Sequence, residues 1–171
     1  MKTANILKVM HILSWIVFTG LCIKTGAILI SYLVSIGNPE ATKDLYAGLN
    51  LSEYYNLSFT QYTFIVSYKI ALFATEAYIA LLVTKLLKAL NLEKPFNIEV
   101  QKLMQNISYS IFNLWILAML HNTHIQYTGK KYGFSMDLFS SDFLFLAGVI
   151  FIFAQIVKRG IEIQSENDLT I

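Results

Sequence analysis

Four long apolar runs are the feature that most restricts the fold of this chain. The last run, FLFLAGVIFIFAQIV at residues 143–157, has Gln155 as its only polar side chain. About 20 helical residues cross the hydrocarbon core of a bilayer, and a helix in lipid pairs its own backbone groups. The runs do not alternate apolar and polar residues, which argues against the strands of a closed barrel. We therefore predict four membrane-spanning helices, at about residues 9–36, 62–90, 105–127 and 138–157.

The composition agrees with a lipid environment. Hydrophobic residues make up 56% of the 171 residues and charged residues 14%, whereas soluble domains contain about 25% charged residues. The net charge of +2 gives no basis for direct nucleic-acid binding. The single cysteine, Cys22, leaves no partner for a disulfide within these residues. We predict an all-α integral membrane four-helix bundle that forms one domain over residues 1–171.

The distribution of cations predicts the orientation of the spans. Lys and Arg are retained in the cytoplasmic loops of membrane proteins. With the N-terminus inside, the cytoplasmic side holds eight cations: Lys2, Lys8, Lys85, Lys88, Lys94, Lys102, Lys158 and Arg159. The outer side holds three: Lys43, Lys130 and Lys131. We therefore expect a multi-pass membrane protein with both termini in the cytoplasm and a cytoplasmic tail at residues 158–171.

The loops between the predicted spans carry signals for helix ends. Asn38-Pro39 is expected to end the first helix, because a residue before proline avoids the helical conformation. The loop at residues 37–61 is long enough to form a small cap. In the cytoplasmic loop, Asn97 is a candidate N-cap, and Glu99 would follow in the first helical turn, where the helix dipole favours an anion. Four tyrosines in or beside the first loop suit the membrane interface: Tyr46, Tyr54, Tyr55 and Tyr62.

Three charged residues fall inside the predicted spans: Lys24, Lys69 and Glu76. A charge deep in a bilayer costs about 2.5–3.5 kcal/mol on insertion scales, so it usually faces a bundle interior or a cavity. Lys69 and Glu76 share a helix face but lie about 10 Å apart along the axis, too far for a tight direct contact. Lys24, on the neighbouring antiparallel helix, is a candidate partner for Glu76. One interpretation is a structural ion pair, and the other is a proton or ion relay. We favour the structural interpretation, because transporters usually contain repeats or broken helices, which we do not find here.

A weak metal candidate lies near the outer end of the third span. In HNTH, His121 and His124 are three residues apart and can share one helix face. Asp137 and Asp142 are predicted on the same side of the membrane, so a two-histidine, two-carboxylate site is an alternative. The favoured interpretation is polar residues at the interface that cap a helix end. We predict neither a metal nor any other cofactor.

Catalytic motifs are missing from the sequence. It contains no G-x-S-x-G turn around a nucleophile and no glycine-rich loop for a phosphate. We therefore expect that the protein is not an enzyme and assign no catalytic residue.

Two polar segments carry a resemblance to a known family. They are the loop EKPFNIEVQKLM at residues 93–104 and the ending KRGIEIQSENDLTI at residues 158–171. Together with four spans in this order, they resemble DUF2975, a bacterial membrane family of unknown function. The likeness is strongest at Lys94–Phe96, Gly160 and Glu166–Ile171, and vaguer at LYAGLNLS. The resemblance implies a four-helix integral membrane protein whose gene commonly lies beside one for a very small helix-turn-helix regulator. It implies no catalytic residue.

The predicted cytoplasmic parts are too short to bury a core of their own, so they would act by presenting a surface. Our leading hypothesis is a non-enzymatic membrane partner, or tether, of a small cytoplasmic helix-turn-helix transcription regulator. The surface expected to bind it consists of Lys94, Pro95, Phe96, Arg159, Glu162, Glu166, Asp168, Leu169 and Ile171. The alternative is a small transporter or ion-coupled protein that uses Lys24, Lys69 and Glu76. Small four-span proteins often associate, so a homo-oligomer in the bilayer is a further expectation.

Overall fold

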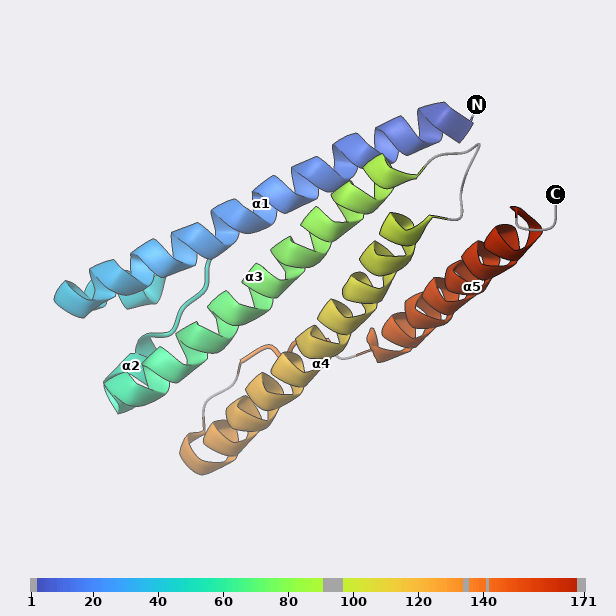
Figure 1. Cartoon of the computed structure of the whole chain (residues 1–171). Helices are drawn as coiled ribbons and strands as arrows, with labels where there is room; N and C mark the ends of the chain where they lie inside the picture. Colours follow the sequence, from blue (N-terminus) through green and yellow to red (C-terminus); the bar gives the residue numbers. More distant parts are fainter. Residues whose placement is uncertain (1–2, 91–96, 134–135, 141, 169–171) are drawn as a thin grey trace. The chain divides into compact units, whose positions relative to one another are not determined.

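A computed structural model of the chain describes residues 3–90, 97–133, 136–140 and 142–168. In these ranges all regular elements are helices (Figure 1). The helices are α1 (Thr3–Gly37), the short 3₁₀ helix η1 (Pro39–Lys43), α2 (Ser52–Leu57), α3 (Phe59–Ala89), α4 (Ile98–Tyr132) and α5 (Leu144–Asp168). The expected all-helical fold is therefore confirmed for the described residues.

Four of these helices, α1, α3, α4 and α5, are long and apolar enough to cross a membrane. Many large apolar side chains on them are exposed to the surroundings rather than to the protein, as expected of helices that face lipid. The prediction of four spans is confirmed, and the chain is a multi-pass membrane protein. The fourth span differs at its start, because α5 begins at Leu144 and not near Leu138.

Hydroxyl groups inside the spans are paired locally. The side chains of Thr25, Thr75 and Thr84 each donate a hydrogen bond to the carbonyl oxygen four residues earlier, at 2.7–2.9 Å. Ser110 does the same to Asn106 at 2.8 Å. Since lipid offers no partner to a hydroxyl, these bonds let polar residues lie in an apolar helix.

The ends of the helices agree with the loop signals. α1 ends at Gly37, and the Asn38 side chain then accepts a hydrogen bond from the Glu40 backbone N–H at 3.2 Å. α4 begins directly after Asn97, whose side-chain oxygen accepts from the Val100 N–H at 2.8 Å. Glu99 lies in the first turn of α4. The predicted helix stop and the predicted N-cap are both confirmed.

The chain divides into two compact units. The loop unit comprises Thr19–Ala77 and Ile116–Ser141. Its core combines residues of α1, α3 and α4 with residues of the first loop. The buried members are Ile28, Leu45, Leu51, Tyr54, Tyr62, Ile65, Val66, Phe73 and Ile125.

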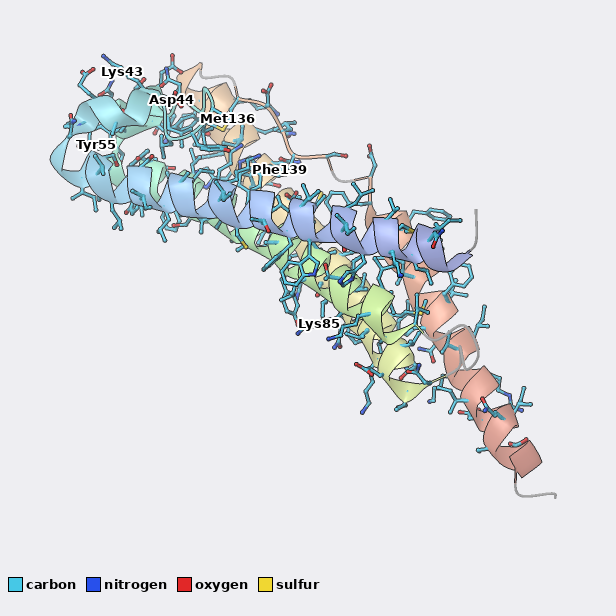
Figure 2. All side chains as sticks on the ribbon, turned by 90° about the horizontal axis from the view of Figure 1, so that it is seen from above. Lys43, Asp44, Tyr55, Lys85, Met136 and Phe139 are labelled. Carbon is cyan, nitrogen blue, oxygen red and sulfur yellow. The ribbon has the colours of Figure 1, made fainter. Side chains whose placement is uncertain are left out.

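The first loop forms a folded cap within the loop unit, as predicted. The Leu51 N–H donates to the Thr42 carbonyl at 2.8 Å, which ties the residue before α2 to η1. Gly48 has a φ of +85°, and its N–H donates to the Asp44 carboxylate at 2.9 Å. Asp44 and Met136, which packs against the same core, are labelled in Figure 2.

Two tyrosines expected at the membrane interface are core residues instead. Tyr54 is 2% exposed and Tyr62 is fully buried. The Tyr62 hydroxyl lies 2.7 Å from the Ser35 hydroxyl of α1. Burial raises the pKa of the Tyr54 phenol, and a hydrogen bond with the Thr128 hydroxyl opposes that rise more weakly. Both phenols are buried because hydroxyl groups of neighbouring helices are available to them.

The tail unit comprises Met1–Phe18, Tyr78–Trp115 and Asp142–Ile171. Its core joins α3, α4 and α5 through Leu82, Ile107, Ile111 and Ala147. The Ser108 hydroxyl of α4 donates to the Ala147 carbonyl of α5 at 2.9 Å. Small and hydroxyl-bearing residues at such contacts let helix backbones approach closely in a membrane.

Candidate functional site

The two intramembrane lysines of the loop unit lie against aromatic rings. The Lys24 Nζ lies 3.7 Å from the centroid of the Phe73 ring, and the Lys69 Nζ lies 4.9 Å from that of Phe139. The two rings are themselves 5.5 Å apart. Lys69 is only 7% exposed. A cation over a ring face gains electrostatic attraction without a carboxylate, so each ammonium group has a partner inside an apolar helix.

Glu76 does not complete the ion pair that the sequence suggested. Lys24, Lys69 and Glu76 all belong to the described residues, and no ion pair within 4.0 Å joins any two of them. Glu76 is partly buried. The Lys24 charge repels that of Lys69 and attracts that of Glu76. Lys24 instead lies over the ring of Phe73, which is three residues before Glu76 on the same face of α3.

The two histidines of α4 have separate surroundings. His121 is fully buried, and its ring forms T-shaped pairs with those of Phe139 and Tyr68 at centroid distances of 5.3 and 6.2 Å. Its Nδ1 lies 3.1 Å from the Asn122 side-chain oxygen, while its buried Nε2 has no hydrogen-bond partner among the described residues. The Nε2 of His124 lies 2.7 Å from the side-chain oxygen of Gln61 on α3.

The structure does not bring the four residues of the weak metal candidate together as one site. In the described parts of the chain, no three His, Cys, Asp or Glu side chains lie close enough to hold a metal ion. Asp137 is exposed on the loop unit, and Asp142 belongs to the tail unit. His124 is engaged with Gln61. The observed surroundings of the histidines are aromatic rings and side-chain amides, which suit helix packing.

Asn122, which no motif in the sequence marks, holds the segment after α4. The Asn122 side chain donates to the Phe139 carbonyl at 2.8 Å and accepts from the Phe139 N–H at 2.9 Å. These two hydrogen bonds to one backbone residue place the Phe139 ring, labelled in Figure 2, against His121 and near Lys69. It also explains why α5 begins late, since Phe139 is fixed outside a helix. An Asn between two histidines gives no signal of this kind in a sequence.

Comparison with known families identifies the chain. The family model described as "Protein of unknown function (DUF2975)" matches residues 37–171. The protein belongs to the DUF2975 family. The match includes the cap, both polar segments on which the resemblance rested, and three of the four spans. Comparisons with curated proteins and with solved structures found no match.

The predicted binding surface of this DUF2975 member is described only in its α5 part. α5 continues through the polar residues to Asp168, so the tail extends the fourth helix. Arg159 and Glu162 are paired at 2.9 Å, and Glu166 is exposed one turn later. The remaining members of the surface lie outside the described residues: Lys94, Pro95, Phe96, Leu169 and Ile171. Of Asp168 only the backbone is described.

Proposed function

We propose that this DUF2975 member is a non-enzymatic membrane protein that binds a small cytoplasmic helix-turn-helix transcription regulator through the polar end of α5. The supporting observation is the continuity of α5, which runs from Leu144 to Asp168 without a break. Its first part is apolar and its last turns are polar, so the helix carries a surface out of the membrane. A helix that is already formed binds a partner without a further entropy cost for ordering its backbone.

The charges of the tail support a partner that binds DNA. After Arg159 the chain contains three carboxylates, Glu162, Glu166 and Asp168, and no cation. DNA-binding proteins carry basic surfaces, which an acidic helix end complements and steers toward itself. Binding at the membrane would then compete with DNA for the regulator. The choice of a helix-turn-helix regulator rests on the gene neighbourhood that the family resemblance implies.

Co-purification from mild detergent tests this proposal. The full chain is compared with a chain that ends at Val157, and soluble partners are identified by mass spectrometry. Binding is then tested again with each purified partner. We expect a small DNA-binding protein to be retained by the full chain and lost on truncation. A charge-reversed tail, Glu162→Lys with Glu166→Lys, should also lose it, whereas Glu53→Lys in the exposed part of the cap should not. Retention by the truncated chain contradicts the proposal.

A small ion-coupled transporter is the second candidate, and the burial of Lys69 favours it. Ionisable residues inside spans often mark proton or ion pathways. The test is proton flux in vesicles that contain a pH-sensitive dye, with Glu76→Gln and Lys69→Met. Transport predicts that flux is lost while thermal stability is kept. If the wild-type protein gives no flux and the variants change only the melting temperature, the charges have a packing role.

A further inference from the structure

A groove in the tail unit lies between the start of α1 and the end of α3. It has a volume of about 410 Å³. Leu7, Ile12 and Leu87 contribute apolar walls, while Lys8, His11 and Lys88 contribute polar groups. Among the described residues that line it, none is acidic. The groove therefore has apolar walls and carries positive charge.

Helix geometry explains this combination of residues. Leu7 and His11 are four residues apart on α1, as are Lys8 and Ile12, so all four lie on one helix face. Lys88 lies in the last turn of α3. Above the groove, the hydroxyls of Ser14 and Thr84 are 3.0 Å apart and fix α1 against α3. The groove is thus a feature of two docked helices and needs no ligand to form.

The position of the cations along the spans agrees with the depth of lipid headgroups. Lys8 lies near the beginning of the candidate span Asn5–Gly37, and Lys88 near the end of Phe59–Ala89. Both lysines are exposed. Lys side chains at such positions extend their charge to the membrane interface. The apolar walls continue from there toward the hydrocarbon region.

We propose that this groove binds one anionic phospholipid. Its phosphate lies between Lys8 and Lys88, and an acyl chain follows the wall formed by Ile12 and Leu87. Charge complementarity selects this occupant: a helix from a second copy would bring apolar residues to two ammonium groups, and a free phosphate would leave the apolar walls unused. Clusters of cations between helices at the membrane surface are known to suit anionic headgroups. This binding does not depend on the proposed regulator.

Native mass spectrometry of the full chain tests the proposal. The protein is exchanged into micelles that contain equal amounts of phosphatidylglycerol and phosphatidylcholine. We expect one phosphatidylglycerol to be retained in preference to phosphatidylcholine. Because each interfacial lysine contributes a factor of about 5, Lys8→Gln with Lys88→Gln should weaken retention by about 25-fold. Equal retention of both lipids by the wild-type protein overturns the proposal.

A matched control removes the same charge elsewhere in the tail unit. Lys85→Gln with Lys102→Gln deletes two exposed lysines that do not line the groove; Lys85 is labelled in Figure 2. This variant should retain phosphatidylglycerol like the wild type, and equal losses in the two variants would contradict a specific site. If Lys8→Gln with Lys88→Gln fails to fold, Ile12→Trp fills the groove with its charges kept and should also lose the lipid. Thermal stabilisation by inorganic phosphate alone that matches the effect of the lipid would overturn the choice of a phospholipid.

Discussion

At the scale of single residues, side chains that bond to the backbone determine the local structure. Asn38 and Asn97 act at helix ends, where the sequence predicts them because the preferences of capping positions are local. Asn122 acts across 17 residues of chain, and its role depends on where Phe139 lies. A local sequence pattern carries no information on a contact between residues so far apart in the chain, so this part of the candidate site was not predictable.

Asn122→Ala should destabilise the loop unit. The Phe139 backbone N–H and carbonyl would both lose their side-chain partner at a part-buried position, and a typical hydrogen bond contributes about 0.5–1.5 kcal/mol. We expect a lower melting temperature in detergent and faster amide exchange at residues 136–140. Asn113→Ala, at an exposed position of α4, is the control. Equal melting temperatures for the two variants would show that the two hydrogen bonds of Asn122 contribute nothing to stability.

Gly48→Ala should destabilise the cap through its backbone alone. Gly48 has a φ of +85°, and an added Cβ would meet no atom within 4 Å. A side chain in the left-handed region costs about 1–2 kcal/mol. Gly20→Ala, in open space on a regular helix, should leave stability unchanged or raise it slightly. Thermal unfolding compares the two, and a neutral Gly48→Ala would mean that the turn relaxes to another conformation.

At the scale of elements, the spans were predictable and their ends only in part. Helices in lipid follow from apolar length, which the sequence displays directly. Ends set by local signals, at Gly37 and Ile98, agree with the prediction. The start of α5 at Leu144 does not, because Leu138 and Phe139 are as apolar as the helix they precede. Hydropathy cannot distinguish an apolar residue in a helix from one packed against a core.

Removal of the α4 cap tests how an element end is fixed. Asn97→Ala deletes the acceptor for the Val100 N–H and should cost about 1 kcal/mol. Asn97→Asp keeps an acceptor at the same place and adds a charge that the helix N-terminus favours. Amide exchange at residues 99–101 should rise in the first variant only. The same increase in both would mean that the first turn is held by other contacts.

At the scale of the whole molecule, the orientation in the membrane is predicted from charge. After Cys22→Ala, single cysteines are introduced at the exposed residues Asn56, in α2, and Gln164, in α5. We expect a membrane-impermeant maleimide to label Asn56→Cys in intact cells and Gln164→Cys only after permeabilisation. The reverse pattern would place both termini outside and would remove the proposed tail from contact with cytoplasmic regulators.

Because most of α1 is exposed, only a few of its residues determine where the helix docks. Its most apolar stretch contains no buried residue, and the family match begins only at its last residue, Gly37. A side chain that meets lipid must be apolar, but it need not be any particular apolar residue. The place of α1 is then specified by a few residues: Ile28, which is buried in the core of the loop unit, and Ser14, Tyr32 and Ser35, whose hydroxyls meet hydroxyls of α3. Exchanging the lipid-facing residues of α1 among Leu, Ile and Val should therefore preserve the helix and its docking. Replacing Ser14, Tyr32 or Ser35 with an apolar residue should weaken the docking of α1 on α3.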